Sequence, residues 1–503
     1  MRSKKAVFNI IANLFLQIFI FAYGFILPKI VIQKYGSNVN GLISSITQFL
    51  SYISLLESGV GPVVKSILYK PLSNHNKSEI EDILYSTEVF FKRIAYIFLV
   101  YILILFFVYP RIIVGDMNRF YISSLIVIIA ISIFAEYFFG MVYSIFLQAN
   151  QESYVISSIQ IITYILAITF SLVISQFNIS IHMFRLVLSL IFLLRPIIQW
   201  TYVKKKYDIS LKNANKDYNL SNKWDGLAQH IAYVIHTNTD ITILTIFSSL
   251  SEVSVYSVHM IVVKGIKALI TSFTNGIDAS FGDMISKHEM NNLRRKFEAY
   301  ELFYFLMCAI FFSCTFALII PFITLYTKNF NDANYIRPLF CILLVMSELI
   351  WAIRLPYLTI VYAAGRFKET RVGAWIECIL NIFISVISVK YWGIIGVTIG
   401  TIVAMLFRTT EFVFYSNKNI LNTNVFSSLK KILLMVCIIL FNVICISSFL
   451  KIQYSSYFIW FLSALKVFII YSFISFFIII LFYRNIVMVS IEFIKFSIFK
   501  RRS

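Results

Sequence analysis

Long apolar stretches recur from one end of this chain to the other, and they restrict its fold more than any other feature. Each holds about 20 residues, enough for a helix to cross roughly 30 Å of hydrocarbon. Of the 503 residues, 59% are hydrophobic and 14% are charged, which is not the composition of a soluble domain. We therefore predict an all-α polytopic membrane protein with about 14 transmembrane helices. The predicted spans are 6–33, 38–66, 89–109, 120–147, 155–176, 182–203, 226–248, 253–283, 301–325, 336–363, 371–390, 393–415, 429–450 and 458–483.

The first apolar stretch and the placement of basic residues set the expected orientation. This stretch contains Asn9, Asn13 and Gln17 and lacks a small-residue cleavage site, so we interpret it as a spanning helix and not as a cleavable signal. The formal net charge is +20, and most Lys and Arg residues fall in loops on one side of the predicted helices. The positive-inside rule accounts for this placement, so nucleic-acid binding is not expected. We predict a multi-pass protein of the cell (inner) membrane with both termini in the cytoplasm.

The sequence offers no constellation of catalytic or metal-binding side chains. All six cysteines lie within or at the edge of predicted spans without a CxxC motif, which is typical of buried, inert thiols. The predicted outer loops are short, the longest being near 110–119 and 326–335, so a catalytic outer domain has no room. We therefore predict that the protein is not an enzyme and has no metal site and no cofactor.

The most polar segment, "KKKYDISLKNANKDYNLSNKWDG" at 204–226, follows the sixth predicted span and marks a boundary. Segments on its two sides match at a nearly constant spacing: "SNVNGLISS" at 37–45 with "SEVSVYSVH" at 251–259, and "GVGPVVKSI" at 59–67 with "GIDASFGDM" at 276–284. A parallel repeat of this kind predicts two pseudo-symmetric six-helix lobes. The predicted parts are an N-terminal lobe at 1–203, a cytoplasmic basic linker at 204–225, a C-terminal lobe at 226–415, and helices 13 and 14 with a basic cytoplasmic tail at 416–503.

Two stretches carry a family resemblance. They are "YGSNVNGLISSITQFLSYISLLESGVGPVVKSILYKPL" at 35–72 and "LSEVSVYSVHMIVVKGIKALITSFTNGIDASFGDMIS" at 250–286. Both resemble Wzx-type O-antigen and capsule flippases of the multidrug/oligosaccharidyl-lipid/polysaccharide exporter superfamily, and the topology is similar along nearly the whole chain. The resemblance implies a flippase for polyprenyl-diphosphate-linked oligosaccharides in surface polysaccharide synthesis, with glycosyltransferases and a polymerase of the same pathway as partners. It also implies that helices 13 and 14 line a groove for the lipid tail.

Four cations within predicted spans are candidates for binding this substrate. A charge at mid-membrane costs about 2.5 to 3.5 kcal/mol on insertion scales, so it is kept where water or a partner is present. Arg185 and Arg195 lie on helix 6, and Lys264 and Lys267 lie on helix 8. A cationic cavity suits a diphosphate and acidic sugars, because Arg offers bidentate contacts to phosphate and Lys a point charge. Neighbouring polar residues that we assign to the same cavity are Gln199, Asn13 and Gln17; the alternative is that these polar stripes form hydrogen bonds between packed helices.

Other polar groups within the spans have two interpretations. Asp240 either pairs with Lys264 or, together with His236 one turn away, binds a coupling ion such as H+ or Na+; the membrane potential is a third source of drive. Glu136, Glu348 and Glu377 are interpreted as protonated or bonded to a neighbouring helix. A multidrug or cation antiporter of the same superfamily is the alternative function, and a membrane-embedded glycan polymerase is a weaker one.

A duplicated motif predicts a hinge or gate. In "LLESGVGPVVKS" a carboxylate precedes residues that loosen or kink a helix, and "TNGIDASFGDMIS" repeats this pattern in helix 8. Glu57 and Lys65 lie eight positions apart, about 12 Å along a helix, so they cannot touch unless the helix breaks between them. The residues assigned to the hinge are Glu57, Gly59, Gly61, Pro62, Lys65, Gly276 and Asp278.

Overall fold

The structure, a computed structural model, confirms the predicted all-helical fold. It describes residues 2–57, 60–113, 117–209, 227–274, 277–366, 368–446, 448, 450 and 452–499, and within these ranges the regular elements are all helices. Twelve helical segments are long and apolar enough to cross a membrane. One of them, Arg371–Leu421, contains two of the predicted spans. The helix at the predicted span 226–248 is not among the twelve, because polar side chains such as Asn238 and Asp240 interrupt its apolar face.

The chain forms two compact units, Met1–Val258 and His259–Ser503. The predicted linker lies mostly outside the described residues, and the predicted division into lobes stays a prediction. Unit 1 contains α1 (Arg2–Tyr35), α2 (Ser37–Ser51), α3 (Ser54–Glu57), α4 (Val60–Ser73), α5 (Lys77–Ile112), α6 (Arg119–Ala135), the π-helix η1 (Glu136–Gly140), α7 (Met141–Ala149), α8 (Ser153–Ile174), α9 (Ile181–Tyr207), α10 (Leu227–Phe247) and the start of α11 (Leu250–Ser272). Unit 2 contains the rest of α11, α12 (Ile277–Ser286), α13 (Met290–Tyr326), α14 (Pro338–Ala363), α15 (Arg371–Ser416), η3 (Asn417–Leu421), α16 (Val425–Leu440), η4 (Phe441–Ile446) and α17 (Tyr457–Phe499).

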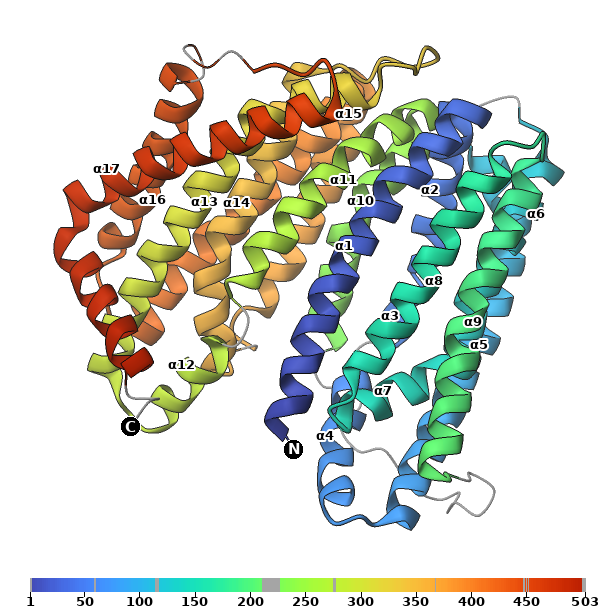
Figure 1. Ribbon diagram of the computed structural model, residues 1–503, viewed down its shortest axis with the longest axis horizontal. Helices are drawn as coiled ribbons and strands as arrows, with labels where there is room; N and C mark the ends of the chain where they lie inside the picture. Colours follow the sequence, from blue (N-terminus) through green and yellow to red (C-terminus); the bar gives the residue numbers. More distant parts are fainter. Residues whose placement is uncertain are drawn as a thin grey trace. The chain divides into compact units, whose positions relative to one another are not determined.

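Long neighbouring helices build the interior of unit 1. In Figure 1, α1, α8 and α9 run along this unit, and α1 packs on α8, which packs on α9. Polar hydrogen bonds add to this packing, as is common between membrane helices. Asn40 of α2 donates to Ser254 Oγ of α11 at 2.8 Å. These two residues are matched with each other in the predicted repeat.

A sharp reversal divides α15 into two halves. Gly393 has φ 54° and ψ −128°, a conformation that side-chain-bearing residues rarely adopt. The two halves then pack closely: an added Cβ at Gly400 would lie 2.1 Å from Ser385 Oγ. Asn381 Nδ2 donates to Thr401 Oγ1 at 3.0 Å across the same contact. Small residues therefore let the two predicted spans form a tight helical hairpin.

Candidate functional site

An aromatic cluster holds Arg195 in the interior of unit 1. Its guanidinium carbon lies 4.5 Å from the ring centre of Tyr164 on α8 and 4.3 Å from that of Phe192 on α9. Its Nε donates to Thr163 Oγ1 at 2.8 Å. Its Nη2 is buried and has no hydrogen-bond partner among the described residues. Stacking and one hydrogen bond thus orient the guanidinium and leave a buried donor for another group.

Arg185 lies in the same interior, two to three turns before Arg195 on α9. Its Nε is also buried, and the described part of the chain offers it no hydrogen-bond partner. Tyr23 of α1 is within electrostatic reach of both arginines, and its ring centre is 5.2 Å from that of Tyr164. A buried donor without a partner costs roughly 1 to 3 kcal/mol, and more when it is charged. The interior of unit 1 therefore contains both Arg185 and Arg195, each with a guanidinium N–H donor that forms no hydrogen bond with the described residues.

The neutral residues assigned to the cavity form interhelical contacts instead. Gln199 is buried and accepts a hydrogen bond from Ser144 Oγ of α7 at 2.8 Å. Asn13 of α1 accepts one from Ser157 Oγ of α8 at 2.8 Å. Gln17 is exposed and forms no hydrogen bond with the residues that the structure describes. The contacts of Gln199 and Asn13 match the packing alternative, and a role for any of the three in substrate binding stays a prediction.

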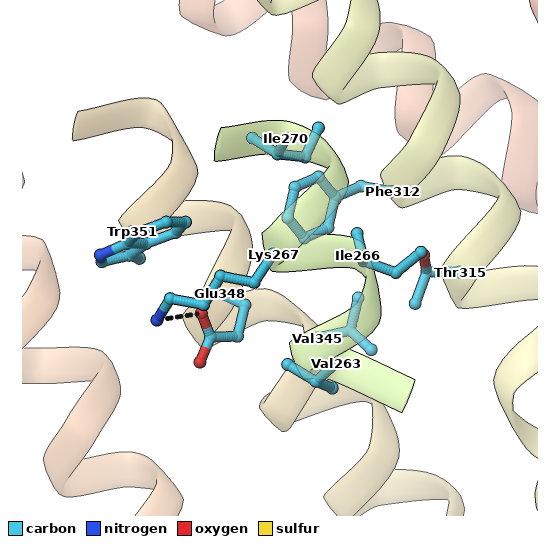
Figure 2. Close-up of a pocket in the computed structure, with 9 residues that line it drawn as sticks. All are labelled: Val263, Ile266, Lys267, Ile270, Phe312, Thr315, Val345, Glu348 and Trp351. Carbon is cyan, nitrogen blue, oxygen red and sulfur yellow. Dashed lines mark hydrogen bonds and ion pairs between the residues drawn. The ribbon is translucent and has the colours of Figure 1, made fainter. Parts of the chain in front are cut away.

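In unit 2, a carboxylate neutralises Lys267. Its Nζ lies 3.1 Å from Glu348 Oε2 of α14 and 3.9 Å from the ring centre of Trp351, as Figure 2 shows. The pocket beside them has a volume of about 10 Å³, enough for about one water molecule. Glu348 is thus bonded to a neighbouring helix, as predicted. Lys264, one turn earlier on α11, is exposed and has no ion-pair or hydrogen-bond partner among the described residues of unit 2.

A second buried ionic cluster joins α14 to the two halves of α15. Arg354 Nη1 lies 2.7 Å from Glu377 Oε1, and Arg408 Nε lies 3.7 Å from Glu377 Oε2. Arg408 also pairs with Glu411 and donates to the carbonyl oxygen of Thr370. This confirms the interpretation of Glu377 as bonded to a neighbouring helix. Because its charges are paired with each other, the cluster fixes packing and does not offer a free charge to a ligand.

The candidate coupling residue Asp240 is buried in unit 1. Tyr256 of α11 donates a hydrogen bond to Asp240 Oδ2 at 2.7 Å. Asp240 and Lys264 belong to different units, and their pairing stays a prediction. The side chain of His236 lies outside the described residues. A coupling role for Asp240 and His236 therefore stays a prediction as well.

The hinge motif lies partly outside the described residues. The predicted second span is divided into α2, α3 and α4, with α3 ending at Glu57 and α4 beginning at Val60. Gly59 lies outside the described residues, Gly61 and Pro62 occupy the first turn of α4, and no ion pair joins Glu57 to Lys65 in the described structure. In the repeat, α11 ends at Ser272 and α12 begins at Ile277. Asp278 is exposed in the first turn of α12, and Gly276 lies outside the described residues.

Glu136 was not among the predicted site residues, yet it lies within electrostatic reach of Arg195. Glu136 begins η1, and π-helical turns occur frequently at functional sites. Its carboxylate lies against Gly140, where an added Cβ would be 3.0 Å from Glu136 Cδ. Arg195 and Glu57 are within its electrostatic reach, and the next residue, Tyr137, lies beside Glu57. The sequence "EYFFG" does not predict a π-helix. The structure was therefore needed to place Glu136 near both Glu57 of the hinge and Arg195.

The long apolar helices define the class, a polytopic membrane protein. No family model and no curated protein sequence matches the chain. Among solved structures, the chain is similar to the lipid II flippase MurJ in an inward closed conformation, with a TM-score of 0.69 and 15% identity over 96% of this chain and 100% of that one. It is also similar to an inward-facing multidrug resistance MATE family transporter of the MOP superfamily, with a TM-score of 0.59 and 12% identity over 82% and 96% of the two chains. A third similar structure is a mutant of the Vibrio cholerae MATE transporter VcmN, with a TM-score of 0.55 and 15% identity over 85% and 99%. The chain therefore has the fold shared by these transporters.

Proposed function

We propose that the protein is a flippase that moves lipid-linked, polyprenyl-diphosphate oligosaccharide units across the cytoplasmic membrane for surface polysaccharide synthesis. The observation that carries the proposal is the pair Arg185 and Arg195, whose buried guanidinium donors have no partner among the described residues. The fold similarity to a lipid II flippase along 96% of the chain supports a lipid-linked substrate.

A diphosphate can accept hydrogen bonds from the guanidinium donors of Arg185 and Arg195 that have no partner among the described residues. Guanidinium groups bind phosphate oxygens in a bidentate manner, and such charge-assisted bonds are about twice as strong as neutral ones. The unpartnered atoms, Arg185 Nε and Arg195 Nη2, lie in one interior beside the Tyr23 and Tyr164 rings. Aromatic faces also suit sugar rings, which present apolar C–H surfaces. Neither covalent chemistry nor a cofactor is needed, since exposing this interior to one side and then to the other is sufficient.

The transport cycle and its setting follow from the same proposal. The lipid tail stays in the membrane in a groove that α16 and α17 line, where the exposed apolar side chains of α17 include Phe458, Phe473 and Phe477. A coupling ion, H+ or Na+, or the membrane potential drives the cycle, with Asp240 and His236 as coupling residues. Both termini lie in the cytoplasm, and glycosyltransferases and a polymerase of the same pathway act before and after transport.

The direct test is genetic complementation with a chemical measurement. Deleting the gene should make lipid-linked glycan accumulate on the cytoplasmic face, and the wild-type chain should restore export. Arg195→Ala should lower export at least about tenfold, because a charge-assisted hydrogen bond contributes roughly 1.5 to 3 kcal/mol. Arg111→Ala, at the exposed end of α5, is the matched control and should export normally. If the deletion strain still exports its glycan while no other flippase is active, the proposal is wrong.

The second candidate function is a multidrug or cation antiporter. It is favoured by the similarity to two MATE transporters and by Glu57 and Glu136, two carboxylates within electrostatic reach of each other in unit 1. An antiporter of this kind should change the susceptibility of the deletion strain to cationic drugs while glycan export stays normal. Measuring both properties in the same strain separates the two functions.

A further inference from the structure

A polar cavity of about 430 Å³ lies at one end of unit 2 and has no part in the proposed transport site. Its walls come from the beginning of α13 and from the segment that leads through η3 into α16. Arg294 and Arg295 line it from α13, and Thr423, Ser427 and Lys431 line it from the other side. The bounds of α13 and α16 place the cavity at the ends of two membrane-spanning helices, at the end that we predict to face the cytoplasm.

The charges deep in the cavity are already balanced. Lys431, whose side chain is 3% exposed, lies 2.7 Å from Glu301 and 3.3 Å from Glu298. Tyr357 donates a further hydrogen bond to Glu301 Oε1 at 2.5 Å. The lysine therefore serves to bind α16 to α13, and its charge is not available to an anion.

The two arginines nearer the opening are different. Arg294 uses its Nε to bind the carbonyl oxygen of Leu421 at 2.5 Å, and that is its only hydrogen bond to described residues. Arg295 is exposed and forms neither a hydrogen bond nor an ion pair with any described residue. Their free guanidinium nitrogens, the hydroxyls of Thr423 and Ser427, and the amino-terminal end of the 16-residue helix α16 border one cavity. The Thr423 hydroxyl already donates to Asn417, and Asn424 caps the amino terminus of α16, so the donors left for a ligand are the guanidinium nitrogens and the Ser427 hydroxyl. Two converging Arg groups and a hydroxyl form a site for a tetrahedral oxyanion such as phosphate.

Apolar side chains beside the cavity identify where that phosphate comes from. On α16, Phe426 and Leu433 are 69% and 63% exposed, and Leu429 lies between them on the same face. In a membrane-spanning helix such residues contact acyl chains. Lys418 is exposed near the same end, and basic residues at this depth attract anionic lipids. We propose that this cavity binds the phosphodiester headgroup of an anionic phospholipid, with its acyl chains along α16.

The test is lipid binding to the purified full-length protein in a neutral detergent. Phosphatidylglycerol is titrated while thermal unfolding is followed and the bound lipid is counted by native mass spectrometry; phosphatidylcholine and inorganic phosphate are titrated separately. The titrations are run at about 0.5 M salt, where exposed charges are largely screened. We expect phosphatidylglycerol alone to raise the unfolding temperature, with one tightly bound lipid per chain.

Variants separate the cavity from the surrounding basic surface. Arg295→Gln should weaken phosphatidylglycerol binding at least about tenfold, because it removes charge-assisted hydrogen bonds. Ser427→Glu, an exposed change that adds a negative charge to the cavity wall, should weaken binding to a similar extent. Lys430→Gln removes another exposed charge, on α16 but outside the cavity, and should change binding less than about threefold. Equal losses in Arg295→Gln and Lys430→Gln, retained binding in both cavity variants, or equal stabilisation by inorganic phosphate would each overturn the proposal.

Discussion

Replacing Glu377 by Gln should strongly destabilise unit 2. The substitution keeps the shape of the side chain and removes the only carboxylate that pairs with Arg354 in the described structure. Both side chains are 9% exposed, so the arginine cannot turn to water. At an effective dielectric constant of about 20, the 2.7 Å contact alone corresponds to roughly 6 kcal/mol of Coulomb attraction. Desolvation offsets part of this, and breaking a buried pair typically costs about 3 to 5 kcal/mol.

Denaturant unfolding of the purified protein in detergent, followed by tryptophan fluorescence, measures this change. Glu411→Gln is the matched control: the Glu411 side chain is 25% exposed and Arg408 keeps Glu377, so we expect a loss of about 1 kcal/mol or less. The double variant Arg354→Met with Glu377→Met should recover most of the loss, because it leaves neither charge buried without its partner. The reasoning is wrong if Glu377→Gln unfolds within about 1 kcal/mol of the wild type.

Three further substitutions test other contacts. Burial favours a raised pKa for the Glu152 carboxyl, but hydrogen bonds from Tyr207, Lys206 and Lys5 outweigh it and lower the pKa. The stabilisation that the ionised carboxylate contributes is therefore complete above about pH 4.3 and is lost as the pH falls through the lowered pKa. Glu152→Gln should weaken the fall of the unfolding free energy in acid. Gly400→Ala should cost about 1 to 3 kcal/mol in denaturant unfolding because of the close contact with Ser385, whereas Gly282→Ala, whose Cβ meets its nearest neighbour at 3.7 Å, should change stability by less than about 0.5 kcal/mol. Lys267→Met should cost about 3 kcal/mol by leaving Glu348 buried without its cation, and adding Glu348→Met should recover most of that loss in the same measurement.

The fold was predictable because its determinants are local in sequence. A run of about 20 apolar residues can satisfy its backbone in a membrane only as a helix, so the spans follow from counting. The reversal falls at Gly393, the first residue of the predicted span 393–415, where the apolar run is too long for one helix. The expectation that Glu348 and Glu377 bond to other helices also follows from the sequence, because an unpaired carboxylate in the membrane interior costs a large free energy.

The partners of these charges were not predictable, because they depend on how helices rotate against one another. Lys267 and Lys264 lie three positions apart on α11, yet Lys267 forms an ion pair with Glu348, whereas Lys264 forms neither an ion pair nor a hydrogen bond in the described part of unit 2. Periodicity places both on similar faces and does not say which of them meets α14. Glu136 depends on a different non-local cause, the π-helix η1, which begins at Glu136 and packs on α9. The sequence alone therefore does not predict which side chains pair across neighbouring helices.

The two units differ in what their buried cations can do. In unit 2, a carboxylate lies within 4.0 Å of each of four cations, Lys267, Arg354, Arg408 and Lys431, so these charges form ion pairs within the protein and are not free to bind a ligand. In unit 1, Arg195 is held by aromatic rings and one hydroxyl, and neither it nor Arg185 forms an ion pair among the described residues. An entering diphosphate would have to displace a carboxylate in unit 2, whereas in unit 1 it meets donors that are already oriented and unused. This difference in pairing, and not the number of positive residues, is why we assign headgroup recognition to unit 1.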